Sequence, residues 1–66
     1  MNISLVLLGS FESELKDKKY KIYQFIDVNS LTIINGTDLG DNLEIGKTYK
    51  CNVSIKNGKL KVTSVI

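Results

Sequence analysis

The most constraining feature of this sequence is a pair of alternating segments joined by the dipeptide Asn57-Gly58. Before the dipeptide, every second residue is apolar: Tyr49, Cys51, Val53 and Ile55. After it, Leu60 and Val62 alternate with lysine and threonine residues. Alternation with a period of two places one set of side chains on each face of a strand. Asn-Gly suits the tight turn of a hairpin because both residues accept positive φ. The segment therefore predicts an antiparallel hairpin with one apolar face.

The rest of the chain also divides into short strand-like segments separated by turn signals. We expect five strands, at residues 2–14, 19–28, 31–35, 47–56 and 59–65. The segment 36–46 reads as a loop in which Gly36, Gly40 and Gly46 are flexible points. No segment longer than one turn has a helical period.

Five short strands in 66 residues predict a single all-β domain over residues 1–66. Such strands must bury one face and protect their edges, and closing into a small antiparallel barrel does both. Gly9 lies within the long first strand, where a glycine is typical of a bend or bulge. We expect a five-stranded OB-fold-like barrel, with an SH3-like barrel as the alternative.

The residue types argue against an enzyme or a metalloprotein. The chain has no His and one Cys, so it lacks the usual general base near neutral pH, an internal disulfide and a multi-Cys metal site. We expect no cofactor, no catalytic residue and no metal ligand. Asp38, Asp41 and Glu44 read as a solvated acidic loop, and Cys51 as a buried small apolar residue.

The sequence has no secretory-type signal and no apolar stretch of the length that a membrane span needs. We therefore expect a cytoplasmic protein without a membrane partner.

The second predicted strand contains the best candidate for a binding surface. It carries Tyr20, Ile22, Gln24 and Ile26 in one phase, and Lys19, Lys21, Tyr23, Phe25 and Asp27 in the other. Burying two lysines is costly, so we expect the phase with Tyr20 to face the core. That choice places Tyr23 and Phe25 on the outer face, in line with two lysines.

Exposed rings next to cations suit a single-stranded nucleic acid. Bases stack on aromatic rings and lysines neutralise the phosphates. An OB-fold binds through strands two and three together with the loops between strands one and two and between strands four and five. We therefore predict non-sequence-specific binding of single-stranded DNA or RNA. The predicted site comprises Lys16, Lys18, Lys19, Lys21, Tyr23, Phe25, Lys56 and Lys59.

A protein-interaction or assembly module is the alternative function. Exposed aromatic residues on so small a domain also suit an interface with another chain. We expect a homodimer, because association would compensate for a thin core.

The sequence also resembles a known family. The strand 19–27, the segment 43–49 and the closing hairpin 51–66 resemble the small OB-fold single-stranded-DNA-binding proteins of phages and mobile elements, including the filamentous-phage gene V type. This resemblance implies a dimer that coats single strands without sequence specificity. It also implies that Tyr23 and Phe25 stack on bases and that Lys19 and Lys21 contact phosphates.

Overall fold

The computed structural model describes residues 1–40 and 42–66. All regular elements in this part of the chain are strands: β1 (Asn2–Leu15), β2 (Lys18–Asp27), β3 (Thr32–Thr37), β4 (Thr48–Lys56) and β5 (Lys59–Val65). Every strand end lies within two residues of its predicted position. None of these residues belongs to a helix that could cross a membrane. The all-β prediction is confirmed.

The five strands close into a barrel in the order β1-β2-β3-β5-β4, and β4 returns to β1. Four of the strand pairs are antiparallel, whereas β3 and β5 run parallel. The barrel is therefore mixed, and the prediction of a wholly antiparallel barrel was wrong in this one pair. The alternating pattern could not reveal it, because both kinds of pair alternate in the same way. The arrangement fits a small OB-fold-like barrel.

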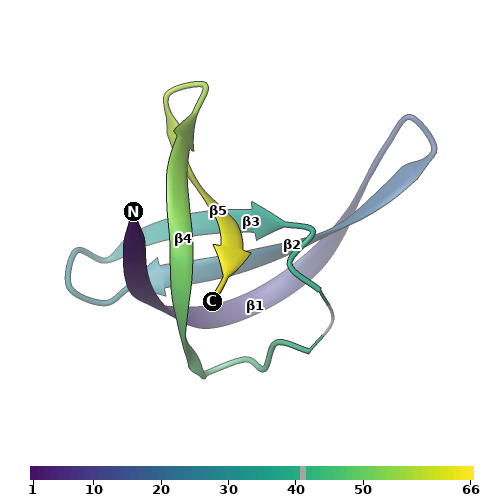
Figure 1. Cartoon of the computed structure of the whole chain (residues 1–66). Helices are drawn as coiled ribbons and strands as arrows, with labels where there is room; N and C mark the ends of the chain where they lie inside the picture. Colours follow the sequence, from purple (N-terminus) through teal and green to yellow (C-terminus); the bar gives the residue numbers. More distant parts are fainter. Residues whose placement is uncertain (41) are drawn as a thin grey trace.

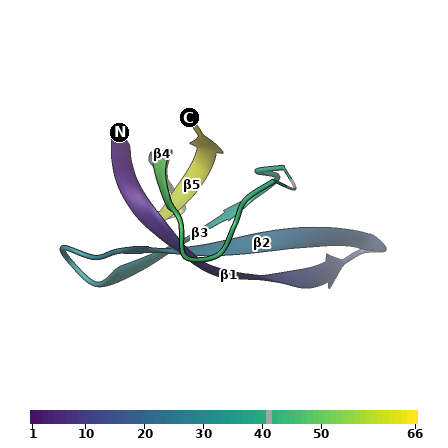
Figure 2. The same cartoon turned by 90° about the horizontal axis from the view of Figure 1, so that it is seen from below.

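Strand β1 joins the two sides of the barrel because it is long and bends (Figure 2). Residues 2–6 pair with β4, and residues 6–15 pair with β2. The register with β2 shifts between Leu7 and Gly9, so one residue of β1 is left over as a bulge. A bulge bends a strand and increases its twist. The bend predicted at Gly9 is confirmed.

Two hairpin turns use residues with positive φ. Asn57 has φ 53° and Gly58 has φ 77°, as predicted for the turn between β4 and β5. Lys16 and Asp17, with φ 50° and 66°, form the turn between β1 and β2. Both turns are two residues long, and this geometry matches the natural twist of the strands that they connect.

Eight apolar residues form the core: Leu5, Leu7, Tyr23, Phe25, Ile34, Cys51, Val53 and Val62. The prediction that Cys51 points inward is confirmed. Gly36, by contrast, is not a loop residue, because it is buried within β3.

Two hairpins project beyond the closed part of the barrel (Figure 1). The β1–β2 hairpin extends furthest, since β3 pairs with β2 only as far as Ile22. The β4–β5 hairpin rises on the same side of the molecule in this view. In an OB-fold these two hairpins flank the ligand-binding face.

Candidate nucleic-acid interface

The structure reverses the predicted phase of strand β2. Tyr23 and Phe25 are only 1% and 0% exposed and belong to the core. Their rings pack against each other with centroids 6.5 Å apart. Gln24 and Ile26 lie in the opposite phase and are half-buried. The prediction that Tyr23 and Phe25 form an exposed stacking platform was therefore wrong.

The physical reason is the length of the β1–β2 hairpin. Lys19 and Lys21 share a phase with Tyr23, but they lie on the part of β2 beyond its pairing with β3. Both lysines are exposed. Burying this phase would bury the two lysines only if the whole strand lay inside the barrel. Because β2 pairs with β3 only from Ile22 onward, the two rings lie in the barrel and the two lysines lie outside it, in water.

The environment of Tyr23 shows that its ring is held in place. Its hydroxyl donates a 2.6 Å hydrogen bond to the carbonyl oxygen of Gly40, in the loop after β3. The Nζ of Lys21 lies 5.1 Å from the ring centroid, within the range of a cation–π contact. These contacts hold the ring within the protomer, so Tyr23 cannot stack on a base without leaving the core.

A different set of apolar side chains occupies the outer face of β1 and β2. Phe11 pairs with Ile22 and Ser13 with Tyr20, so these residues share one face of the hairpin. Phe11 is 46% exposed, and Tyr20 and Ile22 are half-buried. Diagonal neighbours such as Phe11 and Tyr20 have backbones about 7–8 Å apart. The outer face therefore carries two rings at diagonal positions of the hairpin.

Most of the charged side chains of the hairpin lie on one of its two faces. Glu12 pairs with Lys21 and Glu14 with Lys19, on the face opposite to Phe11. Lys18 pairs with Leu15 on the same face as Phe11. The acidic side chains of β1 thus lie on the other face of the hairpin from the outer rings. Lys19 and Lys21, predicted as phosphate contacts, lie among those carboxylates.

A groove of about 650 Å³ adjoins the outer face beside Ile22. Its walls come from β2, from the end of β3 and from the β4–β5 hairpin. Among the described residues, Lys56, Lys59 and Lys61 line it together with one acidic residue, Asp38. All three lysines are exposed. The predicted Lys56 and Lys59 therefore come together with Lys61, whereas Lys16 and Lys18 lie at the tip of the other hairpin.

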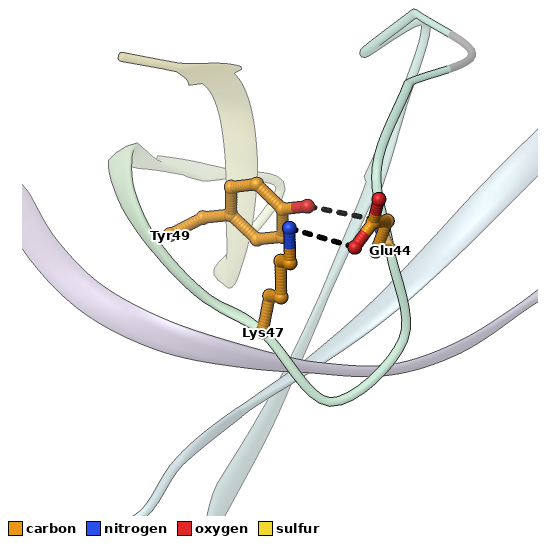
Figure 3. A network of polar contacts seen from close by, with 3 residues as sticks. All are labelled: Glu44, Lys47 and Tyr49. Carbon is orange, nitrogen blue, oxygen red and sulfur yellow. Dashed lines mark hydrogen bonds and ion pairs between the residues drawn. The ribbon is translucent and has the colours of Figure 1, made fainter.

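Between β3 and β4, Glu44 is engaged in local contacts (Figure 3). Its carboxylate pairs with the Nζ of Lys47 at 2.7 Å, and its N–H donates a 2.7 Å hydrogen bond to the Tyr49 hydroxyl. The hydrogen bond to Glu44 and the charge of its carboxylate raise the pKa of Lys47. These contacts fix the approach to β4 and leave Lys47 less available to an anionic ligand.

The described residues contain no group of three or more side chains suited to hold a metal ion. Asp38 and Glu44 are exposed, as expected for a solvated loop, and Asp41 lies outside the described residues. Burial raises the pKa of the Cys51 thiol, so this side chain stays protonated near neutral pH.

Sequence reasoning missed Phe11, Tyr20 and Lys61 as candidate site residues. A signal for the first two was present, because Glu12, Glu14, Lys19 and Lys21 place charges in the same phase on both sides of the turn. Charged residues in matching positions on both strands indicate a ribbon outside the core. The other face of this ribbon, to which the intervening residues belong, can then carry Phe11 and Tyr20.

Comparison with known proteins found no matching family model, no similar curated protein and no similar solved structure. The resemblance to phage single-stranded-DNA-binding proteins therefore stays a prediction.

Proposed function

We propose that this protein binds single-stranded DNA or RNA, with little sequence preference, on the outer face of the β1–β2 hairpin and in the groove that adjoins it. The observation that carries the proposal is the continuity between two features. The apolar face with Phe11, Tyr20 and Ile22 leads into the groove that Lys56, Lys59 and Lys61 line, because Ile22 belongs to both. Rings and cations are thus adjacent, as a strand of bases and phosphates requires.

The electrostatics of this face support an anionic ligand. The described lining of the groove carries three lysines and one aspartate, so a formal charge of +2 (3 − 1), equal to that of the whole chain, is gathered on this one surface. Lys18 adds a positive charge on the outer face of the projecting hairpin. Positive charge is therefore concentrated where the phosphates of a bound strand would lie.

The aromatic residues favour an unpaired strand over a duplex. Stacking on Phe11 or Tyr20 needs a base whose flat face is free, and each such contact contributes about 1–3 kcal/mol. In a duplex, neighbouring base pairs already cover those faces. A single strand is also flexible enough to follow a surface that turns from the hairpin into the groove.

Fluorescence anisotropy with a labelled oligo-dT at several salt concentrations tests this function. Neutralising three phosphates of a single strand gives a slope of about −2 for log K against log salt. The variant with Lys56→Gln, Lys59→Gln and Lys61→Gln should bind more weakly and show a clearly shallower slope. No binding of any oligonucleotide at low salt by a folded protein would refute the proposal.

Lys50→Gln is the matched control. Lys50 is exposed on β4, six residues from Lys56, which corresponds to about 20 Å along a strand. It removes the same kind of charge without touching the groove. An equal loss of affinity for Lys50→Gln and for each single groove variant would show that only the net charge matters.

An assembly function is the second candidate, and the turn between β2 and β3 favours it. Val28, Leu31 and Ile33 are all more than half exposed there, at the end of β2 opposite to the projecting hairpin. Leu31 has φ 57°, an unusual conformation for this residue type. A homodimer formed through this apolar end would leave the groove open in both copies.

Light scattering after size-exclusion chromatography tests the assembly function. If assembly is the function, Leu31→Ser combined with Ile33→Thr should convert a dimer to a monomer and leave oligonucleotide affinity unchanged. A monomeric wild-type protein at all concentrations tested would exclude the homodimer.

A further inference from the structure

The chain contains two Asn-Gly dipeptides, and the fold places them in opposite surroundings. Asn35-Gly36 lies within β3, whereas Asn57-Gly58 forms the turn between β4 and β5. Asparagine followed by glycine is the pair most prone to lose its side-chain amide in water, because glycine has no side chain to shield its backbone nitrogen. The two dipeptides therefore compare the same chemistry in two places of one molecule.

The reaction, deamidation, needs no partner other than water. The backbone nitrogen of the glycine bonds to Cγ of the asparagine, the bond from Cγ to Nδ2 breaks, and ammonia leaves with the proton of the glycine N–H. Water then opens the resulting five-membered ring at one of its two carbonyl carbons, which gives aspartate or isoaspartate. After the loss of a proton to solvent, both products carry a carboxylate in place of the neutral amide.

At Asn57 the structure leaves the reacting groups free to meet. Asn57 and Gly58 are both exposed, and a Cβ added to Gly58 would meet no atom beyond its chain neighbours within 4 Å. The backbone hydrogen bonds of a two-residue turn join its flanking residues, so the Gly58 N–H is left to solvent. Lys56 and Lys59 pair on either side of the turn, and their charges favour the negative charge that develops on the attacking nitrogen.

At Asn35 the barrel prevents the same reaction. Gly36 is buried and pairs with Tyr23 of β2 on one side and with Val62 of β5 on the other. A Cβ on Gly36 would stand 2.8 Å from the carbonyl oxygen of Val62, so the backbone here is packed too tightly to move. Ring closure would require β3 to rotate out of both pairings. The fold thus protects one dipeptide and exposes the other.

We propose that Asn57 is a site of spontaneous deamidation and that the new carboxylate weakens the groove for anionic ligands. Asn57 lines the groove together with Lys56, Lys59 and Lys61. A carboxylate at this position offsets one of the three lysine charges, so the groove loses affinity as the protein ages. The effect on affinity rests on the proposed binding of single strands, whereas the chemistry at Asn57 does not.

Mass spectrometry of the folded protein, incubated at mildly alkaline pH and sampled over several weeks, tests the chemistry. Replacement of the amide by a hydroxyl changes the mass, and fragmentation of the intact chain locates the altered residue. We expect conversion at Asn57 while Asn35 stays intact, and conversion at both residues in protein unfolded in guanidinium chloride. An intact Asn57 in the folded protein, over the time in which the unfolded chain converts, would overturn the proposal.

Anisotropy titration with labelled oligo-dT tests the consequence. Asn57→Asp introduces the charge at once and keeps the turn, since Asp-Gly also suits it. We expect this variant to bind about two- to fivefold more weakly than fresh wild-type protein at low salt, as one exposed charge implies, and the difference to shrink at high salt. Asn57→Gly is the matched control, because Gly-Gly suits the same turn and has no amide to lose. Its affinity should not decline during incubation.

The outcomes separate this inference from the proposed function. Equal affinity of Asn57→Asp and fresh wild-type protein would overturn the effect on the groove and leave strand binding intact. A decline in Asn57→Gly equal to that of the wild-type protein would overturn it too, because the loss would then arise elsewhere. If fresh wild-type protein binds no oligonucleotide, the proposed function fails, and the mass measurement still decides the chemistry at Asn57.

Discussion

The backbone of Gly36 lies directly against Val62, in the parallel pair that closes the barrel. A Cβ on Gly36 would stand 2.8 Å from both the Cβ and the carbonyl oxygen of Val62, and equally close to the Leu39 side chain. Such distances are too short for any side chain. Glycine therefore allows β3 and β5 to approach, and that approach also brings Asn35 and Lys61 to the same wall of the groove.

Replacing Gly36 should destabilise the barrel. Gly36→Ala forces β3 away from a backbone atom of β5, and we expect the free energy of unfolding to fall by about 1–3 kcal/mol. Urea denaturation measures this change. Gly9→Ala is the control, because a Cβ there meets nothing within 4 Å. Equal stability of Gly36→Ala and the wild-type protein would contradict the close approach of β3 and β5.

The outer rings should contribute to binding. Removing the ring in Phe11→Ala or Tyr20→Ala should weaken oligonucleotide binding by about 1–3 kcal/mol if each ring stacks on a base. Anisotropy titration at low salt measures the loss. Ser13→Ala, on the same face opposite Tyr20, should leave the affinity unchanged. If both ring variants bind like the wild-type protein, the outer face of the hairpin is not the stacking surface.

The buried ring of Tyr23 should matter for stability and not for binding. Tyr23→Phe keeps the ring in the core and removes the 2.6 Å hydrogen bond to Gly40. We expect a loss of about 0.5–1.5 kcal/mol in the free energy of unfolding and no change in oligonucleotide affinity. Reduced affinity at full stability would mean that the Tyr23 hydroxyl reaches the ligand.

The Cys51 thiol should make stability depend on pH in the alkaline range. Burial raises its pKa above the ordinary value of 9.0, so the folded state retains a proton that the unfolded chain releases. This stabilising contribution is complete below pH 9 and is lost as the pH rises through the pKa of the folded state. Between pH 8 and pH 10, the urea midpoint should therefore fall further for the wild-type protein than for Cys51→Val. An identical fall in both proteins would show that the thiol titrates normally.

The strand positions and the turn at Asn57-Gly58 were predictable because they depend on local signals. Alternation, turn residues and the mid-strand Gly9 each act over a few neighbouring residues. The parallel pairing of β3 with β5 was not predictable in this way, because it depends on which distant strands meet. The same holds for Gly36, which looks like a loop glycine in sequence and is a packing glycine in the barrel.

The candidate site was harder to predict than the fold. The choice between the two phases of β2 depended on whether Lys19 and Lys21 lie in the barrel, and that depends on where pairing with β3 ends. A wrong assumption about this point placed Tyr23 on the outer face, where the structure has Tyr20. The groove lysines were partly found, since Lys56 and Lys59 flank a recognisable turn, while Lys61 resembled any polar residue of an alternating strand.

The most direct test of the binding surface is a map of backbone amide shifts in the ¹⁵N-labelled protein during titration with an unlabelled oligonucleotide. We expect the largest changes at Phe11, Tyr20 and Ile22 and along the groove at Asn35 and Lys61. The opposite wall, where residues 2–6 of β1 pair with β4, should change little. Changes confined to that wall, or no changes at saturating oligonucleotide, would contradict the account.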